Sequence, residues 1–197
     1  MSRTASLSRV TTETAVQVDV ELDGSGEHRV STGLPFFNHM LAQLARHSGF
    51  DLEVKAKGDL EVDAHHLVED VGLTMGKAVD EALGDRHSVS RFASVAVPLD
   101  ESLVEVALDL SGRPMLVWRG ELPTAGGGLG IPPFDPQLAE EFWRAFSTTA
   151  RITLHVRLAY GRNAHHLVEA SFKAVAHALG SASRMTGSSI PSTKGML

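Results

Sequence analysis

The hexapeptide AHHLVE occupies residues 64–69 and recurs letter for letter at residues 164–169. Each copy is followed by an alanine-rich helical pattern, which ends at Gly84 in the first case and at Gly180 in the second. Two similar amphipathic helices would explain spaced leucines and alanines, but not a repeated pair of histidines. Because histidine is a rare residue, a chance repeat of this kind is improbable in so short a chain. The repeat therefore indicates that the chain contains two copies of one structural unit.

The sequence before the first copy predicts strands and a helix. Valines alternate with polar residues over 16–22, as in a half-buried strand, and Asp-Gly-Ser-Gly at 23–26 predicts a turn. A helix is expected from Phe36 to about Arg46, and a second strand begins at Leu52. The first AHHLVE then opens a helix that a glycine stops.

The second half repeats this order, so the chain is expected to form two lobes of similar plan. Its expected elements are strands near Ser90–Val97, Leu103–Leu110 and Met115–Trp118, a loop rich in glycine and proline at Gly120–Pro136, a helix at about Gln137–Thr148, a strand at Ile152–Leu158 and the second AHHLVE helix. Sheets and helices in separate runs predict an α+β fold, internally duplicated. We assign 9–88 to the first repeat half, 89–182 to the second and 183–197 to a C-terminal tail.

The composition excludes several classes of site and partner. The chain has 197 residues, a formal net charge of −6, 43% hydrophobic residues and no cysteine. Without cysteine there can be no disulfide, thiolate zinc site, iron–sulfur cluster or cysteine nucleophile. No segment approaches the ~18 apolar residues that cross a membrane, and the mild acidity gives no reason to expect nucleic acid as a partner. We expect a soluble, cytoplasmic protein whose ten histidines decide its chemistry.

The repeated His-His-x-x-Glu pattern predicts a metal centre. His65 and Glu69 are four residues apart and share a helix face, whereas His66 points roughly 100° away from His65. One such helix can therefore offer its two imidazoles to two different metals. The second copy supplies His165, His166 and Glu169 in the same arrangement. A nitrogen and oxygen donor set without sulfur suits Mn²⁺, Fe²⁺ or Zn²⁺.

A lone copy of the pattern would equally suit solvated residues at a helix start, and only the duplication favours metal. The single histidines His28, His87 and His177 are expected to lie on the solvated surface. The duplication also points to a pair of additional ligands. His39 lies 26 residues before His65, and Glu141 lies 24 residues before His165, so each could add one donor from the first helix of its half.

Several longer motifs together resemble one known family, the imidazoleglycerol-phosphate dehydratases of histidine biosynthesis. The motifs are FFNHMLAQLARHSGF at 36–50, AHHLVED and AHHLVEA, VPLDESL at 97–103, DLSGRP at 109–114 and PSTKG at 191–195. The resemblance extends from about Arg9 to the C-terminus. It implies a duplicated fold (ribosomal protein S5 domain 2-like) that assembles as a hollow shell of 24 identical subunits, with active sites between subunits.

The resemblance also implies two Mn²⁺ ions per subunit and assigns their ligands. One ion would take His39, His66, His165 and Glu169, and the other would take His65, Glu69, His166 and Glu141. Among these ligands, Glu69 and Glu169 would also be catalytic, while His39, His65, Glu69 and His165 would also contact the substrate.

The remaining implied residues bind the phosphorylated imidazole substrate. Glu13 falls at the position of the substrate-binding acid and base, and His47 and Lys173 fall at substrate contacts. The phosphate-binding set would be Arg91, Arg113, Ser192, Thr193 and Lys194, since guanidinium forks and a lysine charge suit a dianion.

The implied reaction removes water from imidazoleglycerol phosphate and yields imidazole acetol phosphate. No carbonyl acidifies the carbon–hydrogen bond that must break, so direct proton abstraction would be slow. Two metals, one at each ring nitrogen, would hold the ring as an imidazolate that expels the neighbouring hydroxide. Glu13 would then remove the proton that this expulsion makes acidic.

Two positions depart from the family pattern. The family has histidine where this chain has Glu141, and aspartate, expected to orient a ligand imidazole, where it has Asn38. These departures leave two alternatives open: a paralogue that acts on a related azole or imidazole phosphate, and a non-catalytic metal-binding assembly protein. The retained Arg91, Arg113 and Lys194 argue against the second, because storage of metal needs no phosphate clamp.

Overall fold

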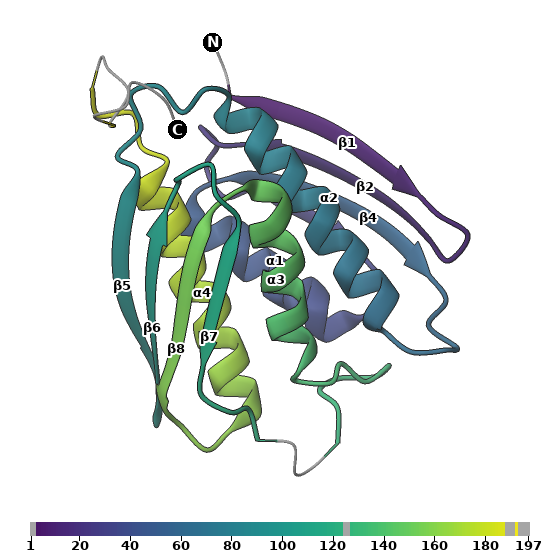
Figure 1. Ribbon diagram of the computed structural model, residues 1–197. Helices are drawn as coiled ribbons and strands as arrows, with labels where there is room; N and C mark the ends of the chain where they lie inside the picture. The colour runs from purple at the N-terminus through teal and green to yellow at the C-terminus, as the bar shows by residue number, and fades with distance from the viewer. Residues whose placement is uncertain (1–2, 124–126, 188–191, 193–197) are drawn as a thin grey trace.

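The structure, a computed structural model, describes residues 3–123, 127–187 and 192. Two four-stranded sheets enclose a layer of four helices (Figure 1). The first half comprises β1 (Thr4–Val10), β2 (Thr14–Glu21), β3 (His28–Ser31), α1 (Pro35–Ser48), β4 (Asp51–Gly58) and α2 (His65–Leu83). The second half comprises β5 (Phe92–Leu99), β6 (Ser102–Asp109), β7 (Met115–Arg119), α3 (Leu138–Ala150), β8 (Thr153–Tyr160) and α4 (Ala164–Ala182).

The two halves have the same topology. The strand order is β1-β2-β4-β3 in one sheet and β5-β6-β8-β7 in the other. The registers agree as well, because Val18 pairs with Val54 in the first sheet and Val106 pairs with Val156 in the second. The predicted internal duplication and α+β class are therefore confirmed.

Alternating side chains fix which face of each sheet meets the helices. Val16, Val18 and Val20 of β2 are buried while the residues between them face outward. In β6 the residues at alternate positions, including Val104 and Val106, are buried in the same way. Each sheet thus turns one apolar face to the helices and leaves the other face outward.

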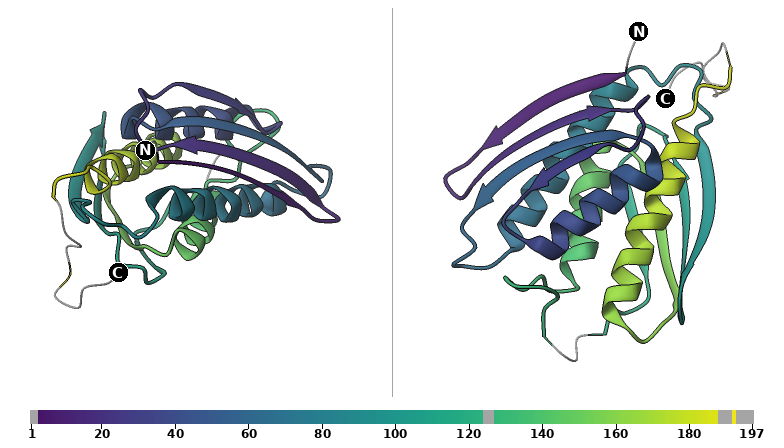
Figure 2. Two further views of the ribbon diagram at one scale, coloured as in Figure 1. Left: turned by 90° about the horizontal axis from the view of Figure 1, so that it is seen from above. Right: turned by 180° about the vertical axis from the view of Figure 1, so that it is seen from behind.

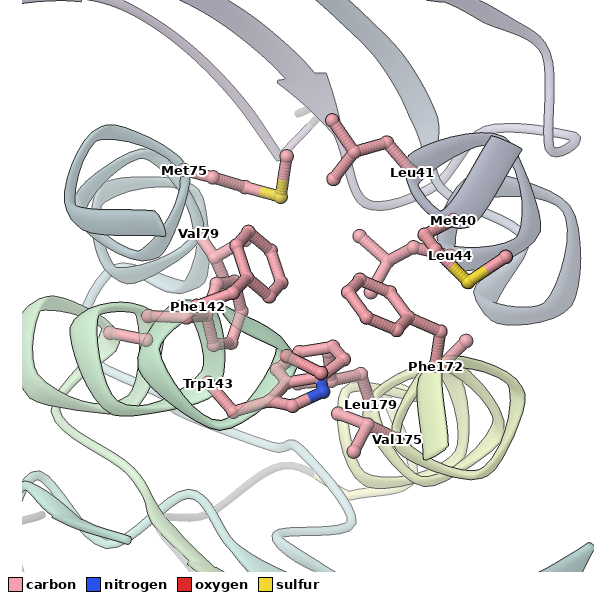
Figure 3. Packing of buried hydrophobic residues seen from close by; sticks show 14 of the residues in the cluster. Met40, Leu41, Leu44, Met75, Val79, Phe142, Trp143, Phe172, Val175 and Leu179 are labelled. Carbon is pink, nitrogen blue, oxygen red and sulfur yellow. The ribbon is translucent and has the colours of Figure 1, made fainter. Parts of the chain in front are cut away.

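The helices pair across the two halves. α1 packs against α4, and α2 packs against α3, so each helix pair combines one helix from each half (Figure 2). Aromatic and aliphatic side chains from all four helices meet in one core, among them Met75, Phe142, Trp143 and Phe172 (Figure 3). The two repeat halves therefore share one hydrophobic core.

Two features differ from the sequence expectations. Residues 4–10 and 28–31 form the strands β1 and β3, although mostly exposed edge positions gave them little apolar alternation. The α4 helix does not end at Gly180 but continues to Ala182. A Cβ at Gly180 would lie 2.3 Å from the backbone oxygen of Ser48, so this glycine permits close packing of α4 on α1 instead of ending the helix.

The described residues of the segment between β7 and α3 form a loop, as expected, and this loop contributes to the core. Phe134 is fully buried and contacts Phe36 and Phe37 at the start of α1. In the described part of the chain, no helix combines the length and the apolar character needed to cross a membrane.

Candidate metal centre and substrate site

The repeated histidines lie at the first turns of α2 and α4. Asp63 accepts a hydrogen bond from the backbone N–H of His65 (2.7 Å), and Asn163 accepts one from the backbone N–H of His165 (2.9 Å). Such side-chain acceptors satisfy N–H groups that a helix start leaves free. The rings of adjacent histidines are nearly perpendicular, at 86° for the pair in α2 and 84° for the pair in α4. Each helix therefore presents its two imidazoles in different directions, as expected from the helical spacing.

One cluster forms where α1 meets α4. The Oε2 atom of Glu169 lies 3.0 Å from Nε2 of His165 and 3.5 Å from Nε2 of His39. Lys173 binds the other carboxylate oxygen of Glu169 at 2.6 Å. Burial opposes ionisation of Glu169, but the hydrogen bond and charge of Lys173, with the neighbouring histidines, outweigh it and lower the pKa of this carboxyl. The structure thus brings three of the expected metal ligands together.

The corresponding cluster on α2 is looser. Nε2 of His65 lies 3.9 Å from Oε2 of Glu69, and both side chains are about half exposed. A hollow of about 420 Å³ lies beside His65, between the start of α2 and the segment that leads into α3. Its lining includes Leu60, Pro133 and Gln137.

His66 belongs to a second group, with Asp59 and Glu13. Nδ1 of His66 lies 3.0 Å from Oδ2 of Asp59 and 3.7 Å from Oε2 of Glu13. The hydrogen bond to Asp59 is the main reason why the pKa of His66 is raised. One donor atom from each of the three residues lies within 4.8 Å of the others, close enough to share an ion. Sequence reasoning named His66 and Glu13 but missed Asp59, which follows β4 without any motif of its own.

The position of Glu13 follows from its turn. The residue lies in the connection between β1 and β2. Asp70 of α2 accepts hydrogen bonds from Nε of Arg9 (2.7 Å) and from the hydroxyl of Thr14, one on each side of the turn. These bonds hold the tip of the hairpin over the start of α2, and so they place Glu13 beside His66.

His166 belongs to a third group at the tip of the β5–β6 hairpin. Its Nδ1 lies 2.7 Å from Oε2 of Glu101, and its Nε2 lies 3.7 Å from Oδ2 of Asp100. The hydrogen bond with His166, and then the backbone N–H groups of Arg162 and Asn163, keep the pKa of Glu101 well below its usual range. Sequence reasoning quoted the motif VPLDESL that contains Glu101 but gave this residue no role.

Glu141 does not reach the residues expected to share its metal. It lies on α3, its side chain is 38% exposed, and its Oε2 is 3.6 Å from Nε of Arg144. Among the described residues it forms no ion pair with His65 or His166. Arg144 also binds Glu140 at 2.6 Å, so one arginine holds both glutamates of this turn.

Asn38 bonds to Thr32. Its Oδ1 accepts hydrogen bonds from the backbone N–H (2.9 Å) and the hydroxyl (2.7 Å) of Thr32. The side chain therefore secures the connection from β3 into α1. Because these bonds need only an oxygen acceptor, asparagine serves here as well as aspartate would. Among the described residues these contacts involve no imidazole, in line with the expectation that asparagine does not take the place of an imidazole-orienting aspartate.

His47 and Lys173 lie further along the groove between α1 and α4. Nε2 of His47 is 2.9 Å from Oε1 of Gln43, and its ring is 5.0 Å from that of His177. Burial is the main cause that lowers the pKa of His47, followed by the charges of His177 and Lys173. His177 itself is exposed, as expected, and so are His28 and His87.

The expected phosphate-binding arginines meet on one carboxylate. Nε of Arg91 lies 2.7 Å from Oδ1 of Asp109, and a guanidinium nitrogen of Arg113 lies 3.7 Å from its Oδ2. The backbone N–H of Arg91 donates to the carbonyl of Ala182, which places this pair at the C-terminal end of α4. Of the expected phosphate-binding residues in the tail, Ser192 is among the described residues, whereas Thr193 and Lys194 lie outside them.

The fold and the clusters of imidazoles and carboxylates at the helix starts define an internally duplicated α+β enzyme with a histidine-rich site. A family model described as imidazoleglycerol-phosphate dehydratase matches residues 32–179. Relatives with that name include one from Methanopyrus kandleri, 52% identical over 99% of this chain and 96% of its own, and one from Moorella thermoacetica, 53% identical over the full length of both.

Two solved structures of imidazoleglycerol-phosphate dehydratases are similar to this chain in fold and sequence. The crystal structure of imidazoleglycerol-phosphate dehydratase from Staphylococcus aureus has a TM-score of 0.82 at 36% identity, and the match covers 93% of this chain and 99% of that one. A structure from Pyrococcus furiosus in complex with (S)-C348 has the same TM-score of 0.82 at 33% identity, and covers 97% of this chain and 100% of that one. The chain belongs to the imidazoleglycerol-phosphate dehydratase family, whose members are hydro-lyases of histidine biosynthesis.

Proposed function

We propose that this enzyme converts imidazoleglycerol phosphate to imidazole acetol phosphate with the help of two Mn²⁺ ions per subunit. The observation that carries the proposal is the duplicated arrangement of perpendicular imidazoles, each with a carboxylate partner. A substrate imidazole has two ring nitrogens, and a site with two metals can engage both. A cytoplasmic location accompanies the proposal, because a phosphorylated metabolite does not cross membranes freely.

The donor set fits manganese. The residues offer imidazole nitrogens and carboxylate oxygens and no sulfur, a combination that suits Mn²⁺. Glu169 is 8% exposed and already has two imidazole nitrogens within 3.5 Å of one oxygen. One cation could bind this buried carboxylate and both imidazoles, and would replace their present contacts with each other. The proposed sets remain His39, His66, His165 and Glu169 for one ion, and His65, Glu69, His166 and Glu141 for the other.

The separation of these groups favours sites shared between subunits. Within one chain, His39, His165 and Glu169 are together, but His66 contacts Asp59 and Glu13 instead. The arginine pair for phosphate lies at the far end of α4, a helix of 19 residues that is about 28 Å long. One small substrate could not touch both ends of this helix. We therefore propose that neighbouring subunits complete each site, within an assembly of 24 copies.

The chemistry asks for a base beside the substrate. When bound, the ions would act as Lewis acids that make the ring N–H of the substrate easier to deprotonate. The electron-rich ring can then expel the neighbouring hydroxide. Glu13, at an exposed hairpin tip with its carboxylate 3.7 Å from His66, accepts the proton from the next carbon. The enol that results takes up a proton and becomes the ketone.

The proposed binding residues have separate tasks. Arg91 and Arg113, which both contact Asp109, would bind the phosphate of the substrate in its place. The tail residues Ser192, Thr193 and Lys194 would bind the same phosphate. His47 and Lys173 would contact the substrate along the α1–α4 groove.

The direct test is an assay of the purified protein with imidazoleglycerol phosphate. The protein is stripped of metal with a chelator, dialysed and reloaded with Mn²⁺. We expect ketone formation only after reloading, together with two Mn²⁺ per subunit by elemental analysis. The absence of turnover in a folded, fully loaded protein would refute the proposed reaction, and one ion or none per subunit would refute the two-metal centre.

A further inference from the structure

The tips of the two equivalent hairpins carry equivalent glutamates. Val18 of β2 corresponds to Val106 of β6, because each pairs with the matching valine of the next strand in its sheet. Counting back along β2 and β6 in this register, Glu13 corresponds to Glu101. Both residues approach Nδ1 of the second histidine in the AHHLVE motif, His66 in one half and His166 in the other.

The two glutamates nevertheless have different surroundings. Glu101 is held firmly: one of its oxygens accepts the His166 contact at 2.7 Å, and the other accepts the backbone N–H groups of Arg162 (3.1 Å) and Asn163 (2.9 Å). Glu13 lies 3.7 Å from its imidazole and is 52% exposed. In the first half Asp59 provides the close contact instead, at 3.0 Å from Nδ1 of His66.

We infer that Glu101, and Asp59 in the first half, are positioning residues that fix the ring tautomer of two proposed metal ligands. A carboxylate can only accept a hydrogen bond, so its partner Nδ1 must carry the proton. Nε2, on the other side of the ring, then keeps its lone pair and can bind a metal; in His166 it lies 3.7 Å from Oδ2 of the exposed Asp100. This inference rests on the proposed metal centre.

The difference between the halves also explains why only one hairpin glutamate can serve as a base. Glu101 uses both oxygens in contacts with the imidazole and with the loop before α4. In the first half Asp59, and not Glu13, makes the close contact with the imidazole, so the Glu13 carboxylate stays available to the substrate. The duplication thus produced two glutamates at the same place, one that holds a ligand and one that is free to react.

The test compares Mn²⁺ binding by Glu101→Gln and wild type. Glutamine keeps an oxygen for the backbone N–H groups of residues 162 and 163, but its amide N–H₂ faces Nδ1 of His166 and favours the opposite tautomer. We expect one of the two Mn²⁺ ions to bind roughly 10–100-fold more weakly, with the other unaffected, when free Mn²⁺ is followed by electron paramagnetic resonance. The thermal unfolding midpoint of the metal-free protein should not change. If Glu101 had only a structural role, its replacement would lower this midpoint.

Two further variants make the result specific. Glu105→Gln removes the same charge from β6, where the glutamate is half-buried and pairs with Arg157, and should bind both ions like wild type. Asp59→Ala, which removes the acceptor, should weaken the other ion, and this tests the inference independently if Glu101→Gln fails to fold. Unchanged binding of both ions by Glu101→Gln, or equal weakening by Glu105→Gln, would overturn the inference while the metal centre stands. A wild type that binds no Mn²⁺ would overturn both.

Discussion

Glu13 shows how a single exposed residue gains a specific position. Its turn is tied to α2 through Asp70, which contacts Arg9 before the turn and Thr14 after it. The second repeat has Ala170 at the place of Asp70, so only the first hairpin is fixed in this way. A carboxylate held near a proposed metal ligand and left without close contacts of its own has the properties of a general base.

We therefore expect Glu13→Gln to keep the fold and the metals but to lose about 10²–10⁴-fold in kcat, because an amide cannot accept the proton. Substrate binding should persist, which a fluorescence or calorimetric titration can check. Glu61→Gln, at an exposed position in the connection before α2, serves as the matched control. Wild-type kcat in Glu13→Gln would show that another residue is the base.

Glu141 tests the proposed ligand set at the same scale. In the structure it pairs with Arg144, so binding a metal requires that this exposed contact be given up; exposed pairs of this kind contribute little, at most about 1 kcal/mol. We expect Glu141→Ala to lower the occupancy of one Mn²⁺ site only, and Glu141→His to raise its affinity or the dehydratase activity.

Glu140→Ala is the control for Glu141, because Glu140 is its neighbour and shares Arg144. Titration with Mn²⁺ distinguishes the three variants. If Glu141→Ala and Glu140→Ala both bind two ions like wild type, the site is completed without Glu141.

At the scale of elements, close helix packing brings the halves together. Gly72 and Gly76 of α2 lie against α3, where a Cβ at Gly76 would be 2.3 Å from the backbone oxygen of Phe146. Phe172 and Ala176 occupy the equivalent places on α4. Glycine is thus used where a helix of one half must approach a helix of the other very closely.

Gly76→Ala should therefore destabilise the protein even though alanine favours helices by about 1 kcal/mol over glycine. The added methyl group meets backbone, which cannot move aside easily, and overpacking of this kind costs about 1–3 kcal/mol or more. Thermal and denaturant unfolding will measure the effect. Gly187→Ala, where no atom lies within 4 Å of the new Cβ, should leave the midpoint unchanged. A gain in stability for Gly76→Ala would contradict the packing argument.

At the scale of the whole molecule, the division of the site groups predicts dependence on assembly. If metals bridge residues of neighbouring subunits, metal binding stabilises the assembled form over separate subunits. Light scattering should find a 24-subunit particle with Mn²⁺ and smaller species after treatment with a chelator. An isolated subunit that stays fully loaded and active at high dilution would contradict shared sites.

Much of the site could be predicted from local sequence. His65, His66, Glu69 and their second copies follow from a repeated motif, because helical periodicity alone sets the directions of neighbouring side chains. The cluster of His39 with Glu169 was anticipated from the family resemblance. In the structure the two side chains lie 3.5 Å apart because α1 packs on α4, while their shared metal stays a prediction.

The sequence by itself determined the duplication, the α+β class and the approximate positions of most elements, and it predicted the metal-donor side chains, because these depend on periodicity and composition within short segments. Only the tertiary structure decided that helices pair across the halves, that Gly180 packs instead of capping, and that Asp59 and Glu101 hold His66 and His166. Glu101 and His166 are 65 residues apart. Their meeting depends on how a hairpin lies over a helix start, and no local pattern encodes that distance.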